Sequence, residues 1–176
     1  MGKRSEFKRV ERDFYPTPWK AVKPLISQLP KEFAFAEPCA GDGALVNHIE
    51  TLMEGGWCSW ASDIEPQNKG IINKHFRDLG EHEFLEADYI ITNPPWDRKL
   101  LHPMIEYFTA FRPTWLLFDA DWIHTKQSTE YLPLLKKIVS IGRVQWIPDS
   151  KSTGKDNCCW YLFDASYVGP TMFYGR

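Results

Sequence analysis

Asn93, Pro94, Pro95 and Trp96 follow one another at the end of a short apolar run, residues 88–92, that contains several β-branched residues. We interpret the run as a buried strand that must end at Pro94, because consecutive prolines cannot donate ladder hydrogen bonds. Its carboxyl end then carries an amide, a backbone carbonyl and an indole face, at the edge where open α/β sheets bind ligands. A proline-rich turn with a packing tryptophan is the alternative interpretation.

A glycine turn forms the second candidate site. The apolar segment 33–37 leads into Pro38-Cys39-Ala40-Gly41-Asp42-Gly43, and a helical pattern over residues 44–54 follows. Strand, glycine turn and helix together let a small ligand approach the backbone, because glycine accepts positive φ and lacks a Cβ atom. The third glycine of the dinucleotide fingerprint is missing. Asp63 directly follows the next predicted strand, residues 57–62. An acid at this position can accept hydrogen bonds from ribose hydroxyls. The alternative interpretation is that Asp63 is an ordinary surface residue.

Two further residues could serve a ligand. Thr17 can cap a helix predicted over residues 20–29, with Pro18 at its first position. The free amides and the hydroxyl there suit a carboxylate, although a plain helix cap is the commoner meaning of Thr-Pro. Asp78 lies in the weakly patterned segment 71–79 and is either a site acid or a loop residue.

Strands and helices alternate along the rest of the chain. One helix is predicted over residues 100–111, entered through Pro103, and another over residues 126–138, broken or started near Pro133. Strands are predicted over residues 114–118, 144–147 and 158–163. The last two strands would form a hairpin joined by the polar loop 148–157. This order predicts a three-layer α/β/α fold, with a mostly parallel sheet and an antiparallel C-terminal edge.

Composition limits the organisation and the partners. The 176 residues, 43% of them hydrophobic, can fill one core, so we expect a single domain over residues 14–176. Residues 1–13 mix both charge signs and form either a frayed terminus or a phosphate-contacting arm. The formal charge of −2 argues against strong non-specific DNA binding, so any nucleic-acid contact must be local.

Cysteine and histidine usage indicates no metal site. The four cysteines form no CxxC pair, and the five histidines show no ligand spacing. The sequence also shows no secretory signal, no apolar run of transmembrane length and no disulfide-like framework. We therefore expect a soluble protein of the reducing cytoplasm, without metal and away from membranes.

The order of four motifs resembles a known family. The motifs are Tyr15-Pro16-Thr17-Pro18, Glu37-Pro38-Cys39-Ala40-Gly41-Asp42-Gly43, Asp63-Ile64-Glu65-Pro66 and Asn93-Pro94-Pro95-Trp96. Together they resemble S-adenosylmethionine-dependent N6-adenine DNA methyltransferases, particularly the small phage-encoded type. The resemblance covers residues 13–97 and extends loosely to residues 160–164. Two departures are the tryptophan where Tyr or Phe is usual, and the lack of a separate target-recognition domain.

The resemblance implies a Rossmann-like class I methyltransferase fold, S-adenosylmethionine as cofactor and DNA as partner, in the host cytoplasm if a phage encodes the protein. Glu37 would face the cofactor's ammonium, Thr17 its carboxylate and Asp63 its ribose. Ile64 would pack on the cofactor adenine, and Asp78 would accept from its amino group. The full implied cofactor set is Tyr15, Thr17, Glu37, Pro38, Gly41, Gly43, Asp63, Ile64 and Asp78.

The implied catalytic motif is Asn93-Pro94-Pro95-Trp96. The side-chain oxygen of Asn93 and the carbonyl of Pro94 would accept the two N–H groups of an adenine amine, which favours a pyramidal nitrogen with a localised lone pair. Trp96 would stack on the base. Most rate enhancement would come from alignment and desolvation, and the adenine must be flipped out or single-stranded.

Two other functions stay open at this point. The same motif serves any planar amide or amidine-type nitrogen, so an RNA adenine N6- or protein glutamine N5-methyltransferase is the first alternative. A catalytically silent module that binds nucleic acid or another partner is the second. Lys151 and Lys155, in the loop 148–157, either contact phosphates or belong to a solvated hairpin loop.

Overall fold

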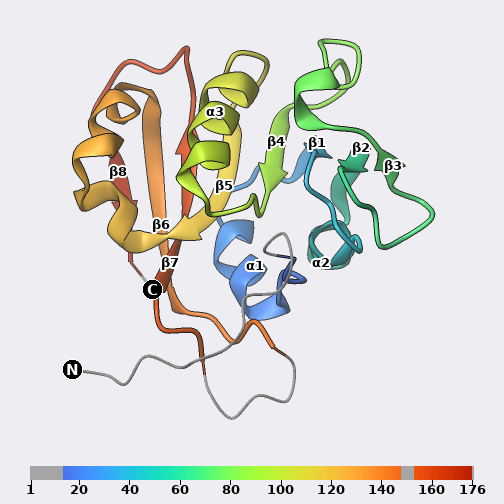
Figure 1. Cartoon of the computed structure of the whole chain (residues 1–176), viewed down its shortest axis with the longest axis horizontal. Helices are drawn as coiled ribbons and strands as arrows, with labels where there is room; N and C mark the ends of the chain where they lie inside the picture. Colours follow the sequence, from blue (N-terminus) through green and yellow to red (C-terminus); the bar gives the residue numbers. More distant parts are fainter. Residues whose placement is uncertain (1–13, 148–152, 176) are drawn as a thin grey trace.

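A single sheet runs through the centre of the computed structural model, which describes residues 14–147 and 153–175. In these residues eight strands pair in the order β3-β2-β1-β4-β5-β7-β6-β8 (Figure 1). The strands are β1 (Glu32–Glu37), β2 (Gly55–Asp63), β3 (Ile72–Asn73), β4 (Tyr89–Thr92), β5 (Thr114–Asp119), β6 (Leu135–Arg143), β7 (Asn157–Phe163) and β8 (Met172–Tyr174).

Strand direction divides the sheet into two parts. The neighbours from β3 to β5 pair in parallel. Strand β7 runs antiparallel to both β5 and β6, while β8 pairs in parallel with β6. This arrangement confirms the predicted mostly parallel sheet with an antiparallel C-terminal part.

Helices cover both faces of the sheet, which confirms the three-layer prediction. Helices α1 (Trp19–Ile26) and α2 (Ala44–Leu52) pack on one face, and α3 (Arg98–Thr109) packs on the other. Successive side chains of β5 point to opposite faces, as a strand period of two requires. Trp115 and Leu117 therefore join the core under α1 and α2, whereas Leu116 and Phe118 join the core under α3.

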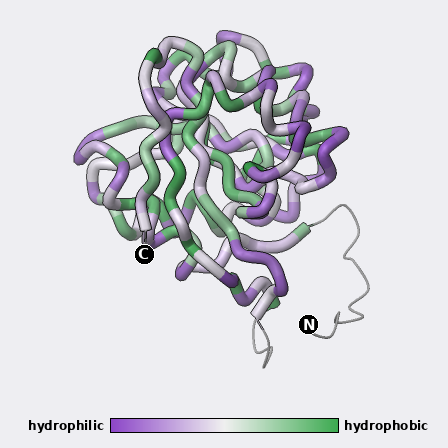
Figure 2. Tube along the Cα trace, turned by 90° about the vertical axis from the view of Figure 1, so that its left-hand side faces the viewer, coloured by the Kyte–Doolittle hydropathy of each residue, from purple (hydrophilic) through white to green (hydrophobic). Residues whose placement is uncertain are grey.

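The buried strands account for the location of the core. Strand β5 is buried along nearly its whole length, and β7 likewise after its first residue. Hydrophobic residues accordingly follow the central strands in Figure 2, and hydrophilic residues gather in the connecting segments. None of the helices in the described part of the chain has the length and apolar character needed to cross a membrane.

Two helix starts differ from the predictions. Pro18, rather than Thr17, is the N-cap of α1, and no side chain caps that helix. Thr17 is buried and precedes this N-cap by one residue. Helix α3 begins at Arg98, because the Asp97 carboxylate accepts a hydrogen bond from the backbone N–H of Lys99 at 3.0 Å. Pro103 consequently lies inside the helix and does not start it.

The predicted helix over residues 126–138 is wrong. Two 3₁₀ turns, η4 (Lys126–Glu130) and η5 (Leu132–Leu134), precede β6. The buried residues Leu135, Ile138 and Val139 are spaced three and four apart, which imitates a helical face. The spacing arises from irregularities in the β6–β7 pairing, which interrupt the usual alternation of a strand.

The bounds of two strands also differ from the predicted ones. The strand predicted over residues 144–147 is wrong, because β6 ends at Arg143. Strand β2 begins at Gly55, two residues before the predicted start at residue 57. The N-terminal arm 1–13 and residues 148–152, which include Lys151, lie outside the described residues.

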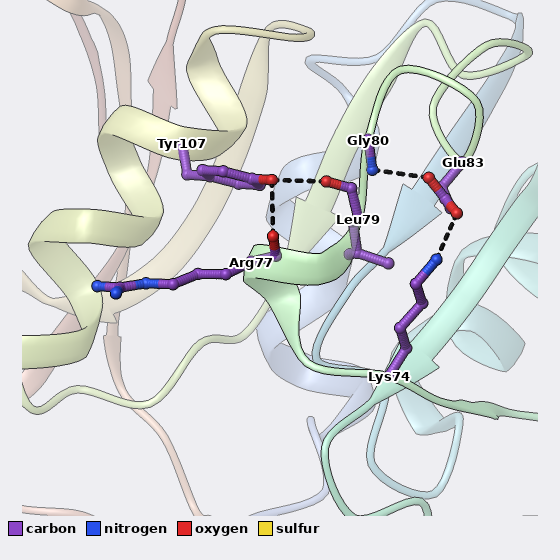
Figure 3. A network of polar contacts seen from close by, with 6 residues as sticks. All are labelled: Lys74, Arg77, Leu79, Gly80, Glu83 and Tyr107. Atoms are coloured by element: carbon purple, nitrogen blue, oxygen red, sulfur yellow. Dashed lines mark hydrogen bonds and ion pairs between the residues drawn. The ribbon is translucent and has the colours of Figure 1, made fainter.

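Polar contacts fasten the segment between β3 and β4 to α3 (Figure 3). The Tyr107 hydroxyl lies 2.6 Å from the carbonyl oxygen of Leu79 and 3.1 Å from that of Arg77. Glu83 accepts from the Gly80 N–H at 2.7 Å and pairs with Lys74. The Tyr107 bonds hold this segment against α3, and the Glu83 contacts join two parts of the segment itself.

The Lys74–Glu83 pair predicts a pH-dependent stability. The hydrogen bond from Lys74 lowers the pKa of Glu83 from its ordinary 4.5 to about 2. A lowered pKa means that the stabilisation is present above pH 4.5 and is lost as the pH falls toward 2. Glu83→Gln should therefore lower the free energy of unfolding at neutral pH, and the difference from wild type should shrink through this window. Urea unfolding at stepped pH measures it, with the exposed Glu86→Gln as control; a difference independent of pH would contradict the assignment.

Candidate active site

Three strands end beside one cavity. Glu37 ends β1, Asp63 ends β2 and Asn93 follows β4, and all three line a cavity of about 670 Å³. Ligands of open α/β sheets bind outside the carboxyl ends of parallel strands, so this position is the expected one. Seven of the nine residues predicted to bind cofactor line it: Tyr15, Thr17, Glu37, Pro38, Gly41, Asp63 and Ile64.

Glu37 is the most unusual group in this cavity. Its side chain is only 1% exposed, and its Oε2 atom has no hydrogen-bond partner among the described residues. Burial raises the pKa of Glu37 well above its ordinary value, and the nearby charges of Asp63 and Asp42 add to the rise. A buried, unpaired carboxyl oxygen is costly unless a donor satisfies it. The geometry suits a ligand that brings a cationic N–H group.

Asp63 organises the glycine turn. Its Oδ2 atom accepts a hydrogen bond from the Gly41 N–H at 2.9 Å, and its Oδ1 atom accepts from the Glu65 N–H at 2.8 Å. One carboxylate thereby joins the end of β2 to the turn that follows β1. Each oxygen keeps a further lone pair, so Asp63 can still accept from a ligand hydroxyl.

The two glycines of the turn have different roles. Both have positive φ, 54° at Gly41 and 87° at Gly43. A Cβ atom on Gly41 would lie 2.6 Å from the Phe14 ring, so the ring would have to shift, and the positive φ favours glycine in any case. On Gly43 it would meet its nearest atom, of Ile71, at 3.6 Å, and Gly43 does not line the cavity. Gly43 is therefore required by the backbone, where it forms the N-cap of α2.

The segment after β3 places His75 and Phe76, rather than Asp78, beside the cavity. Asp78 is exposed, while the other two residues line the cavity wall. His75 Nδ1 accepts from the Arg77 N–H at 3.2 Å, so the proton of the neutral ring is on Nε2. Sequence reasoning missed both residues because segment 71–79 has no periodicity to show which side chains face inward. It also missed Phe14, Leu45, Gln67, Asp97, Leu100 and Met104, which line the cavity too.

Asn93 and Trp96 are held by hydrogen bonds to the protein. The Asn93 side-chain N–H donates to the Tyr15 carbonyl at 3.5 Å. The Trp96 indole N–H donates to the Leu117 carbonyl at 3.1 Å and also lies 3.4 Å from Asn93 Oδ1. The indole N–H therefore faces inward, and Trp96 can offer a ligand only the face and edge of its ring.

A second cavity adjoins the first. It has a volume of about 180 Å³ and is lined by Tyr15, Asn93, Pro94, Trp96, Trp146, Gly154, Lys155 and Asp156. Tyr15 and Asn93 line both cavities, while Pro95 lines only the larger one. Two ligands, one in each cavity, would meet at Asn93. The described residues contain no group of three or more His, Cys, Asp or Glu side chains that could hold a metal ion.

Comparison with known proteins shows what the chain resembles. No family model matches, and no curated protein matches. Among solved structures, a protein assigned as an RNA methyltransferase from Pyrococcus horikoshii is similar with TM-score 0.65 and 17% identity, over 92% of both chains. A protein assigned as the modification subunit of a type I restriction enzyme from Vibrio vulnificus has TM-score 0.56 and 14% identity, over 92% of this chain and 47% of its own.

A third similar structure has TM-score 0.54 and 10% identity, over 89% of this chain and 62% of its own. It is assigned as a class I S-adenosylmethionine-dependent methyltransferase from Listeria monocytogenes. The present chain thus spans about half of the restriction-enzyme subunit. Identities of 10–17% show a shared fold, which is the Rossmann-like class I methyltransferase fold.

The inward indole hydrogen bond predicts the effect of a conservative substitution. Trp96→Phe keeps an aromatic ring but leaves the Leu117 carbonyl without this donor. We expect a loss of about 1 kcal/mol in the free energy of unfolding, the usual net value of one hydrogen bond. Urea denaturation measures it, with Trp57→Phe as the control because Trp57 is 48% exposed. Equal effects of the two substitutions would argue against the indole hydrogen bond.

Proposed function

We propose that the protein is an S-adenosylmethionine-dependent methyltransferase that methylates the N6 amino group of adenine in DNA. The observation that carries the proposal is the pair of cavities that meet at Asn93. A methyl donor in the larger cavity and an amino acceptor in the smaller one would face each other at this residue. The order of the four motifs along the chain supports the same assignment.

The larger cavity fits the proposed cofactor. Its volume of about 670 Å³ is within the usual range for cofactor sites, ~300–1,000 Å³. Glu37 would offer its unpaired oxygen to the ammonium group, and the buried Thr17, which lines the same cavity, would bind the carboxylate. Asp63 retains acceptor capacity for ribose hydroxyls. When bound, S-adenosylmethionine supplies an electrophilic methyl group on a sulfonium.

The other assigned cofactor contacts differ in their support. Ile64, which is 53% exposed and lines the cavity, is free to pack on a flat ring. Tyr15 and Pro38 contribute further wall surface. Asp78 is exposed and outside the lining, so we assign the adenine end of the cofactor to the neighbourhood of His75 and Phe76.

Asn93 and Pro94 provide the acceptors for the amino group. Asn93 Oδ1 has two lone pairs, of which the Trp96 N–H can occupy one, and the second remains for a substrate N–H. The Pro94 carbonyl can accept the other substrate N–H. This pairing makes the amine a better nucleophile, and its extra proton leaves for water after methyl transfer. Alignment in a closed site therefore supplies most of the rate enhancement.

DNA is the proposed acceptor because the motif order resembles that of DNA adenine methyltransferases, and because one structural neighbour is assigned to a restriction enzyme. The target amine is inaccessible within a duplex, so the adenine would be flipped out or single-stranded. The net charge of −2 means that the phosphate contacts must be local.

Adenine in RNA is a second candidate, favoured by the neighbour assigned as an RNA methyltransferase, which matches over 92% of both chains. Labelled S-adenosylmethionine offered with duplex DNA, single-stranded DNA, RNA and a glutamine-containing peptide separates the candidates. Preferred labelling of adenine in DNA is the expected result. Labelling of RNA alone, or of the peptide alone, would replace the DNA assignment.

Glu37 predicts opposite changes in stability and in cofactor binding. Because burial raises the pKa of Glu37, its carboxyl group costs the folded protein stability as the pH rises above the ordinary value of 4.5. Glu37→Gln removes the ionisable group, so thermal stability without ligand should rise at neutral pH. The dissociation constant of S-adenosylmethionine should rise about tenfold to 100-fold, the loss of one hydrogen bond to a charged group.

Calorimetry measures the cofactor affinity, and thermal unfolding of the free protein measures the stability. Glu32→Gln is the matched control, because Glu32 lies at the exposed start of the same strand. Unchanged affinity in Glu37→Gln would remove Glu37 from the cofactor site.

Asn93 separates the chemical step from cofactor binding. Asn93→Ala removes an acceptor that acts most strongly in the transition state, so turnover should fall by about two orders of magnitude or more. Cofactor affinity should stay within about twofold. Single-turnover methylation and calorimetry give the two values, with the exposed Asn47→Ala on α2 as control. Near wild-type turnover would rule out the proposed role.

A further inference from the structure

Three aromatic rings from distant parts of the chain line the smaller cavity. Tyr15 precedes α1, Trp96 follows β4 and Trp146 follows β6. The centroids of Trp96 and Trp146 lie 5.6 Å apart with their planes at 84°, and those of Tyr15 and Trp146 lie 6.4 Å apart at 57°. Trp146 contacts both other rings and so connects the walls of the cavity.

Gly154 lies against the Trp146 ring. The Gly154 N–H donates to the Val144 carbonyl at 2.7 Å, which brings the two segments together. A Cβ atom on Gly154 would lie 3.1 Å from Trp146 Cδ1 and 3.0 Å from the Val144 carbonyl oxygen. The φ of Gly154 is not in the left-handed region, so a side chain there would crowd the indole and the carbonyl oxygen without straining the backbone. The chain therefore leaves room for the indole at this point.

Polar side chains line the cavity as well. Asn93 provides its side-chain amide, and Lys155 and Asp156 are exposed residues of the lining. The Trp96 N–H donates to the Leu117 carbonyl, so this ring contributes an apolar surface to the cavity. A flat ligand here can pack on the rings and hydrogen-bond to Asn93.

We propose that Trp146, positioned by Gly154, is the specificity determinant of the acceptor cavity and selects a flat aromatic base over a glutamine amide. This inference rests on the proposed function, because it assumes that the smaller cavity holds the acceptor. A purine stacks on aromatic walls over its whole face. A glutamine side chain presents only a small planar amide on a flexible stem, and it loses rotamer freedom when it is held. The cavity walls therefore favour the base, although Asn93 can accept from either.

A binding experiment tests the cavity without requiring turnover. The probe is a single-stranded deoxyoligonucleotide with 2-aminopurine in place of one adenine, because the fluorescence of 2-aminopurine falls when it stacks on an aromatic ring. Trp146→Leu should weaken binding of the probe about tenfold and reduce the quenching, since base stacking contributes on this order. Trp146→Phe should restore most of both. Gly154→Ala should weaken binding by displacing the indole.

Gly175→Ala is the matched control for Gly154→Ala, because a Cβ atom there meets no atom within 4 Å. Calorimetry with S-adenosylmethionine monitors the larger cavity and the fold of every variant. The dissociation constant of S-adenosylmethionine should stay within about twofold of the wild-type value. In methylation assays the KM for the adenine substrate should rise in Trp146→Leu and Gly154→Ala, with kcat changed less.

The outcomes distinguish this inference from the proposed function. Equal probe binding and quenching in wild type and Trp146→Leu would overturn the role of Trp146, even if wild type methylates adenine. Loss of probe binding in Trp146→Leu with intact cofactor affinity would support that role, even if another assay showed no methylation of DNA. Methylation of a glutamine-containing peptide in preference to adenine would overturn both.

Discussion

Parallel pairing of β1 with its two neighbours is the constraint on which the site depends. Ala36 pairs with Ile90 of β4, and Glu37 pairs with Ala61 of β2, so the three strands end at nearly the same level. Residues that are far apart in the chain, Glu37, Asp63 and Asn93, thereby reach one edge. Because the side-chain period of a strand is two, a slip of one residue would turn Glu37 to the opposite face.

The site concentrates features that are unfavourable for folding alone. Glu37 is buried with an unpaired oxygen, close to the charges of Asp63 and Asp42, and Gly41 has a conformation that few residues accept. The surrounding structure offsets these costs through the Asp63 hydrogen bonds to the turn and through two apolar cores. Strained and poorly paired groups of this kind persist where a ligand or a reaction requires them.

Local sequence patterns predicted correctly the features that depend on neighbouring residues. The two prolines predicted the end of β4, and the glycines predicted the turn after β1; the structure has both features at these positions. They predicted wrongly the features that depend on pairing with distant parts of the chain. Leu135, Ile138 and Val139 have helical spacing, yet pairing with β7 and β8 makes the segment a strand. Similarly, α1 has Pro18 rather than Thr17 as its N-cap, and α3 begins at Arg98, two residues before the predicted start.

The sequence alone determined the fold class, the strands that end at the larger cavity and seven of the residues that line it, because alternation, proline and glycine act through neighbouring residues. Only the tertiary structure decided that His75 and Phe76, and not Asp78, face the larger cavity. It alone showed that the Trp96 N–H points inward, and that Trp146 closes the smaller cavity. These contacts join segments separated by tens of residues, and no local spacing encodes which of several polar or aromatic side chains will meet.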